Sequence, residues 1–163
     1  MSIVEDRLDQ DHVAMAKPPT IDELYRTQWA SLVRLALVMT GDRGRAEDLV
    51  HDVFLRFAAR PLPLDPPTYL RRMVINAARD HHRRIKVERR FAPTAPLAVF
   101  NPEVDEVIEL LKRLPDRQRH AIALRYYADM DVAQIAQALD CPTGTVKSLL
   151  HRGIEGLRKE MHS

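Results

Sequence analysis

Apolar residues in the C-terminal third of the chain are spaced for two successive helices. The first is predicted over residues 132–139, where apolar side chains recur at i, i+3, i+4 and i+7 and form one buried face. Asp131 and Gln134 have the spacing of a capping box at its start. Residues 140–142 then interrupt the pattern, because Asp tolerates a left-handed turn and Pro142 disfavours a helix through the residue before it. The buried face comprises Val132, Ile135, Ala136 and Leu139.

The second of these helices has an apolar face and a polar face. We expect Thr143 to cap it, because threonine side chains satisfy free N–H groups at helix starts. Its polar face collects donors suited to phosphates and base edges, and a helix fits the major groove of DNA. The pair therefore predicts a helix-turn-helix motif whose second helix reads DNA, with an ordinary helical hairpin as the alternative. The apolar face is Val146, Leu150, Gly153 and Leu157, and the polar face includes Lys147, Ser148, His151 and Arg152.

The N-terminal half predicts three longer helices. Thr20 and Glu23 form a capping box for the first, and Gly41 suits a left-handed residue at its end. The second is expected from about residue 42 or 45 to 60, and the third from about 68 to 87 after a proline-rich loop. The buried stripe of the first helix is Leu24, Tyr25, Trp29, Leu32, Val33 and Ala36, and that of the second is Ala46, Leu49, Val50, Val53, Phe54 and Phe57.

Residues 91–101 separate the two groups of helices. This segment loses charge and gains proline and alanine, which indicates a linker and a domain boundary. Asn101 is expected to cap a fourth helix with Pro102 at its first position, and a fifth runs from about residue 115 through Tyr127 with Tyr126 among its core residues. The sequence therefore predicts an all-α protein of two small domains. Its parts are a mobile tail (1–19), a three-helix bundle (20–90), a flexible linker (91–101) and a helix-turn-helix domain (102–163).

Two outward helix faces carry candidate binding residues. On the second helix an apolar side chain lies beside carboxylates, which fits a docking surface, although acidic residues near a helix start also suit the helix dipole. On the third helix the run from Arg79 to Arg90 holds six basic residues against two acidic ones, and this one-sided charge favours nucleic-acid binding over a merely solvated face. The docking candidates are Asp48, His51, Asp52 and Leu55, and the basic stripe is Arg72, Asn76, Arg79 and Arg83.

The composition of the chain limits the classes of function that it can have. The net charge of the 163 residues is only +2, so any nucleic-acid surface must be local. Cys141 is the only cysteine, which excludes an intramolecular disulfide and suits a reducing cytoplasm. No apolar run in the sequence is long enough to span a membrane, and the acidic N-terminus lacks the order of a signal peptide. The sequence holds no glycine-rich phosphate loop and no paired His or Cys ligands, so we expect no catalytic residue, metal or cofactor.

The ordered set of motifs resembles the extracytoplasmic-function (ECF) sigma factors, two-domain subunits of bacterial RNA polymerase. The resemblance covers about residues 20–160, with both domains in the family's order. It implies that the chain directs core polymerase to promoters and aids their opening. A stand-alone helix-turn-helix regulator of the LuxR-like type is the main alternative, and a protein-binding adaptor is another. The resemblance rests on AEDLVHDVFLRF (46–57) and YLRRMVINAARDHHRR (69–84) in sigma region 2, and on LPDRQRHAIALRYY (114–127) and IAQALDCPTGTVKSLLHRG (135–153) in sigma region 4.

The resemblance also implies a role for each surface. The outer face of the second helix would bind core polymerase through Asp48, His51, Asp52 and Leu55. The third helix would meet the opened non-template strand of the −10 element through Arg72, Asn76, Arg79, Asp80 and Arg83. The last helix would read the duplex −35 element through Thr145, Lys147, Ser148, His151 and Arg152. Many family members are held inactive by an anti-sigma protein, which makes such a protein a candidate partner.

The sequence departs from the family pattern at three places. The loop at residues 60–67, which in the family captures one flipped base, is short and rich in proline here. Leu149 stands where some relatives carry Arg, and Gly153 stands where many carry Ala. These departures leave the base-capturing residue unassigned and predict an altered promoter preference or local helix stability.

Overall fold

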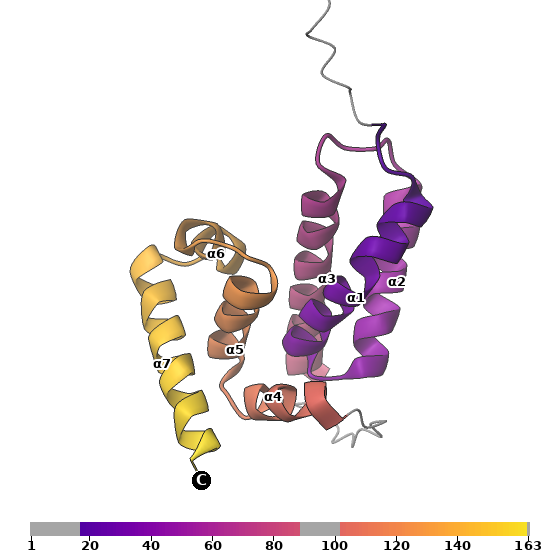
Figure 1. Ribbon diagram of the computed structural model, residues 1–163. Coiled ribbons are helices and arrows are strands. Elements are labelled where there is room, and N and C mark those ends of the chain that lie inside the picture. The colour runs from indigo at the N-terminus through magenta and orange to yellow at the C-terminus, as the bar shows by residue number, and fades with distance from the viewer. Residues whose placement is uncertain (1–16, 89–101, 163) are drawn as a thin grey trace, which may run out of the picture.

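The computed structural model describes residues 17–88 and 102–162, and these residues form helices and turns without a strand (Figure 1). The predicted all-α class is confirmed. In this described part of the chain no helix is both long and apolar enough to cross a membrane. The N-terminal group contains α1 (Ile21–Thr40), α2 (Arg43–Ala58) and α3 (Pro66–Glu88). The C-terminal group contains α4 (Pro102–Lys112), α5 (Asp116–Ile122), the π-helical turn η1 (Ala123–Tyr127), α6 (Val132–Leu139) and α7 (Thr143–Met161).

Side chains next to the helix ends fix the limits of α1 and α2. Thr20 Oγ1 accepts a hydrogen bond from the Glu23 N–H at 3.2 Å, and the Glu23 carboxylate accepts one from the Thr20 N–H at 2.8 Å. The predicted capping box is therefore present. Gly41 ends α1 with φ of +74°, the left-handed conformation predicted for it. Asp42 caps α2 by accepting a hydrogen bond from the Arg45 N–H at 2.8 Å.

The third helix begins two residues before its predicted start. Pro66 and Pro67 occupy its first positions, where a missing N–H removes no helical hydrogen bond. Hydrogen bonds from the side chain and the backbone of Thr68 lower the pKa of Asp65, just before the helix. Leu64, one residue earlier, is fully exposed. Pro66 and Pro67, which were predicted to lie in the loop, are therefore the first residues of α3, and the loop is shorter than predicted.

The helices α1, α2 and α3 pack side by side around a common core (Figure 1). The predicted core face of α2 is buried except for Leu49, which is half-buried. The predicted stripe of α1 is buried except for Tyr25 and Trp29, which lie toward its N-terminal end. Ile75 of α3 is only 2% exposed although the helical pattern did not include it in the core. It lies at a groove between α3 and α6.

Residues next to its two ends also fix the limits of α6. Asp131 accepts a hydrogen bond from the Gln134 N–H at 2.8 Å, and the Gln134 side chain accepts one from the Asp131 N–H at 2.9 Å, so this capping box is confirmed. Asp140 adopts the left-handed conformation with φ of +50°, as its residue type allows. Three of the four predicted core residues of α6 are buried and Val132 is half-buried.

The start of α7 and the end of α5 differ from prediction. Thr143 does not cap α7 but is its first residue; Pro142 precedes it in extended conformation and makes no side-chain bond. The last turn of the fifth helix is π-helical, with the Ala128 N–H bonded to the Ala123 carbonyl at 3.2 Å. This wider turn shifts the helical register, and Tyr126 is therefore 59% exposed rather than part of the core. The predicted cap at Asn101 lies outside the described residues.

The two groups of helices pack against each other. α4, α5 and η1 lie against α1, whereas α7 packs on α4, α5 and α6 (Figure 1). The buried apolar residues of both groups form one continuous cluster. Met39 near the end of α1 and Leu124 of η1 are both fully buried within it. The position of the C-terminal helices therefore decides which faces of α1 and α3 remain open to a partner.

Candidate nucleic-acid and polymerase interface

The polar face predicted for α7 is open to solvent. Val146 and Gly153 are buried on the opposite face, so α7 packs by one side and presents the other. Thr145, in the first turn, is half-buried. His151 lies 3.6 Å from Glu155 one turn further on. The exposed residues are Lys147, Ser148, His151 and Arg152. A helix held in this way can enter the major groove of a duplex with its cations and hydroxyl facing the DNA.

Two glycines let α7 approach its support closely. A Cβ atom at Gly153 would lie 2.6 Å from Ile122 Cδ1, and one at Gly156 would lie 2.7 Å from Leu114 Cδ2. Real Cβ atoms essentially never come that near, so any other residue would require at least the ends of the Ile122 and Leu114 side chains to shift. Glycine at position 153, one of the departures from the family pattern, thus leaves room for the Ile122 side chain.

The outer face of α2 carries the predicted docking residues together. All four are exposed, and Leu55 is 60% exposed in spite of its apolar side chain. These four are Asp48, His51, Asp52 and Leu55. The face combines negative charge with an apolar centre, which suits a partner with basic and apolar groups.

An aromatic cluster borders this face, and its two members on α1, Tyr25 and Trp29, were predicted to lie in the core. Tyr25 and Trp29 stack with ring centroids 4.7 Å apart, and Trp29 meets the His51 ring edge-on at 6.5 Å. Tyr25 also lies 5.0 Å from the ring of Phe54. Because Tyr25 and Trp29 are only partly covered, they extend the α2 face onto α1. Their spacing of four residues along one helix was the signal for a shared face.

The five residues predicted to meet the −10 element do not share one surface. Arg72, Asn76 and Arg79 line a groove of about 680 Å³ whose other wall comes from α6 and the turn before it. Asp80 instead lines a smaller groove of about 330 Å³ between α2 and α3, together with Asp48 and Asp52. Arg83, one turn further along α3, is exposed. Asp80 therefore lies apart from Arg72, Asn76 and Arg79, which together form the cationic wall of α3.

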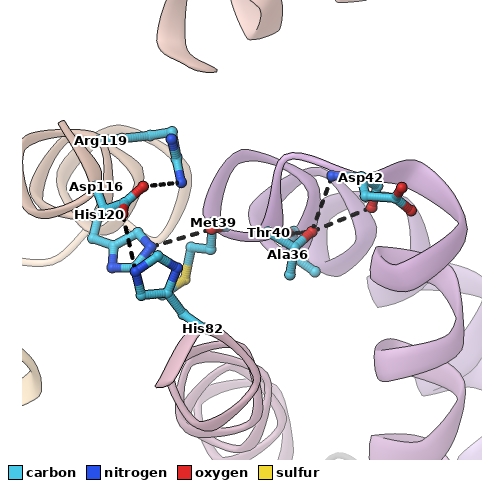
Figure 2. A network of polar contacts seen from close by, with 8 residues as sticks. All are labelled: Ala36, Met39, Thr40, Asp42, His82, Asp116, Arg119 and His120. Carbon is cyan, nitrogen blue, oxygen red and sulfur yellow. Dashed lines mark hydrogen bonds and ion pairs between the residues drawn. The ribbon is translucent and has the colours of Figure 1, made fainter. Parts of the chain in front are cut away.

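Polar contacts join the end of α1 and the C-terminal part of α3 to α5 (Figure 2). His120 Nε2 donates a hydrogen bond to the Met39 carbonyl at 3.1 Å, and His82 Nε2 lies 3.1 Å from the Asp116 carboxylate. The Asp116 carboxylate also accepts a hydrogen bond from Arg119 at 2.8 Å. Beyond the view of Figure 2, Arg71 Nη1 donates to the Ala128 carbonyl at 3.2 Å. No signal in the sequence marked His120 for this position.

Burial makes His120 an uncharged hydrogen-bond donor. The side chain belongs to a residue that is 6% exposed, and burial lowers its pKa from 6.5 to about 4. The bond to Met39 opposes this change, whereas the charges of Arg119 and His82 reinforce it. Arg119 is itself 7% exposed, and its Nε has no hydrogen-bond partner. Next to this contact, one buried polar atom among the described residues, Arg119 Nε, is therefore left unsatisfied.

Both halves of the chain match known family models. Residues 24–87 match sigma-70 region 2, and residues 105–156 match sigma-70, region 4. The match to region 2 does not favour the stand-alone LuxR-like regulator considered as an alternative. The two models cover the helices that carry all three candidate surfaces.

Similar proteins of known name support the same assignment. The RNA polymerase sigma-E factor of Streptomyces avermitilis is 30% identical over 152 residues, which are 87% of this chain and 85% of the relative. The ECF RNA polymerase sigma factor SigL of Mycobacterium tuberculosis is 32% identical over 160 residues, 89% of this chain and 90% of the relative. The sigma factor RpoE of Bartonella quintana, solved in complex with the anti-sigma factor NepR, shares the fold with a TM-score of 0.64 at 19% identity, covering 86% of this chain and 98% of that one. With both sigma regions in order and relatives matched over most of their length, the chain belongs to the ECF sigma factors of RNA polymerase.

Proposed function

We propose that this sigma factor uses three separate helix faces for three tasks in transcription initiation. The outer face of α2 docks on core polymerase, the cationic wall of α3 holds the opened −10 strand, and α7 reads the duplex −35 element. The observation that carries this division is the exposure of the α2 face and the α7 face on helices that pack in different parts of the fold. The α2 face and the α7 face are each open to a partner of their own.

Docking on the polymerase rests on the α2 face and its aromatic border. Asp48 and Asp52 supply negative charge beside the exposed Leu55, and Tyr25 and Trp29 add apolar area from α1. An apolar centre with a charged rim is the usual composition of a specific protein interface. The relatives are named as sigma factors of RNA polymerase, which supports core polymerase as a partner, and we assign that partner to this face.

Strand holding is assigned to Arg72, Asn76 and Arg79, with Arg83 extending the wall. Proteins bind single strands with a cationic track along the backbone and with groups that contact bases. Asn76 is exposed between the arginines and offers an amide to a base edge. Asp80 is left out of this wall, because it faces α2 and would repel phosphate.

The protein acts in the cytoplasm as a binding subunit and catalyses no reaction itself. Its partners are core polymerase and promoter DNA, with an anti-sigma protein as a further partner. RpoE of Bartonella quintana, which shares this fold, was solved in complex with the anti-sigma factor NepR. No cofactor enters the proposal.

The docking assignment is tested by reversing charge on the α2 face. Asp48→Arg combined with Asp52→Arg should leave a helical, folded protein that no longer co-purifies with core polymerase, because two like charges now face the partner's basic groups. Binding should fall at least tenfold in a pull-down titrated with core enzyme, a factor that corresponds to about 1.4 kcal/mol.

The matched control places the same charges elsewhere on the bundle. Ala58→Arg with Ala59→Arg adds two arginines at the exposed end of α2, beyond the proposed docking residues. This control should bind core polymerase like the parent. Normal binding by the Asp48 and Asp52 variant would contradict the assignment.

A further inference from the structure

We infer that the groove between α2 and α3 binds a helical segment of core polymerase, in which a basic side chain lies among the carboxylates of Asp48, Asp52 and Asp80. The groove has a volume of about 330 Å³. The inference rests on the docking function proposed for the outer face of α2 and adds a second wall to that face. It moves Asp80 from the promoter-binding surface, where the family resemblance placed it, to the polymerase-binding surface.

The groove is continuous with the proposed docking face. Asp48 and Asp52 belong to both, since they are exposed on α2 and also line the groove. Arg45 and Arg56 extend the α2 wall at its two ends, so this wall spans roughly 16 Å at 1.5 Å per residue. That length corresponds to about three helical turns, and a groove between two helices accepts the side chains of a third.

The charges along the groove follow from the register of its two helices. α2 and α3 are joined by a short loop and run in opposite directions (Figure 1). Arg45 Nη1 lies 3.3 Å from His81 Nε2, which fixes the two helices relative to each other. Asp80 therefore lies close to the stretch of α2 between Arg45 and Asp48, whereas Arg84 lies beyond Arg45. The groove thus has carboxylates in its middle and guanidinium groups toward its ends.

The carboxylates in the middle of the groove are not neutralised by ion pairs within the protein. Among the described residues, no ion pair involves Asp48, Asp52 or Asp80, and all three side chains are exposed. The same holds for the exposed guanidinium group of Arg84. A partner helix with a basic group at its centre and an acidic group toward one end would meet opposite charges along the groove. Such a match fixes the position and the direction of the partner.

Other occupants fit this groove less well. Its three carboxylates repel the phosphates of a nucleic-acid strand. A metal ion needs several ligands around one point, and no group of side chains in the described parts of the chain provides them. Leu49 and Ala77, both half-buried, give the groove an apolar floor under a charged rim, the usual composition of a protein interface. Core polymerase is the partner we assign, because the groove shares Asp48 and Asp52 with the docking face.

The test uses two substitutions that change the net charge in opposite directions. Asp80→Asn removes a negative charge from the middle of the groove, and Arg84→Gln removes a positive charge from its end. If the groove charges are matched one by one, each change should weaken binding of the full-length protein to core polymerase about fivefold. If the partner is attracted only by the general negative charge of the α2 face, Arg84→Gln should strengthen binding instead. The measurement is an equilibrium titration with core polymerase from the same organism.

Three control variants separate groove charge from overall charge. Asp80→Glu keeps the carboxylate and should bind core polymerase within twofold of the parent. Glu109→Gln on α4 and Arg117→Gln on α5 remove one exposed charge of each sign from helices that do not form the groove, and both should bind like the parent. Equal urea midpoints for Asp80→Asn and the parent would show that the loss of binding is not a loss of fold. Asp48→Asn combined with Asp80→Asn should lose less affinity than the product of the single losses, because both carboxylates face one partner cation.

A second measurement separates the groove from the −10 surface. Asp80→Asn should bind a single-stranded DNA 12-mer of random sequence within twofold of the parent, whereas Arg72→Ala with Arg79→Ala should weaken that binding. A loss of 12-mer affinity in Asp80→Asn with unchanged polymerase binding would return Asp80 to the −10 surface and overturn the inference.

Two further results would overturn the inference and leave the docking function intact. One is normal polymerase binding by Asp80→Asn, and the other is equal or tighter binding by Arg84→Gln, each in an assay where Asp48→Arg with Asp52→Arg abolishes binding. Normal binding by the Asp48 and Asp52 variant would overturn the docking function and the inference together.

Discussion

Gly153 shows how one absent side chain shapes the helix-turn-helix domain. An added Cβ would lie 2.6 Å from Ile122 Cδ1 and 3.3 Å from Ile122 Cγ1. Alanine in place of glycine improves helix propensity by about 1 kcal/mol, whereas overpacking costs typically ~1–3 kcal/mol. The steric term exceeds the propensity term on average. Glycine is therefore favoured here, where the family pattern commonly has alanine.

Gly153→Ala should lower the free energy of unfolding by about 1 kcal/mol in urea denaturation. The loss should shrink when Ile122→Val removes the Cδ1 atom that an alanine Cβ would meet. Gly144→Ala is the control in the same helix, since a Cβ there meets nothing within 4 Å. That variant should be no less stable than the parent. Equal losses at the two glycines would show that packing against Ile122 is not the cause.

The ends of single helices could be predicted where the residues that fix them are close neighbours in the sequence. The capping boxes at Thr20 and Asp131 and the left-handed Gly41 needed only neighbouring residues to form, and all three are present. Tyr126 was misplaced because a π-helical turn adds a residue to the turn, and no pattern of apolar spacing encodes that. Thr143 failed as a cap because the extended Pro142 already supplies the capping backbone position.

We expect the two cations on the exposed face of α7 to have different roles, with Arg152 contacting a base and Lys147 contacting phosphate. Arg152 carries a planar fork that can grip a guanine edge with two bonds, whereas Lys147 is a point charge suited to phosphate. Arg152→Ala should cost about 1–3 kcal/mol at the preferred −35 sequence and relax one base position. Lys147→Ala should weaken all sequences equally and reduce the salt slope by about one unit. The measurement is binding to single-base variants of a selected −35 duplex at several salt concentrations, and the reverse pattern would exchange the two roles.

At the scale of the whole molecule, the contact between the two groups of helices lay beyond sequence reasoning. His120 is buried where α1 and α3 lie against α5, and the period of α5 does not encode this. Asp80, which the family resemblance grouped with Arg72, Asn76 and Arg79, faces α2 instead, whereas those three face α6. Faces of single helices follow from periodicity, whereas grooves between helices follow from tertiary packing.

Acid should weaken this contact through His120. Its pKa is about 4 in the fold and 6.5 ordinarily, so the unfolded chain binds more protons between these values. The stabilisation is complete above pH 6.5 and is lost as the pH falls toward and below 4, in total roughly 3 kcal/mol. His82 from α3, Asp116 and Arg119 from α5 and the Met39 carbonyl from α1 face the ring.

The urea midpoint of the parent should therefore fall more steeply between pH 6.5 and 4 than that of His120→Gln. The glutamine amide can still donate to Met39 but does not titrate in this range. Parallel pH dependences in parent and variant would contradict a buried, neutral His120.

The aromatic border of the α2 face gives the protein a built-in optical reporter. Trp29 is the only tryptophan in the chain, it is half-buried, and its ring meets that of His51 on the face proposed to bind polymerase. Its emission colour depends on how much water surrounds the indole, and its brightness depends on a nearby imidazolium. When tryptophan is excited selectively, fluorescence of the unlabelled protein therefore reports on this face, because the helix-turn-helix domain has tyrosines but no tryptophan.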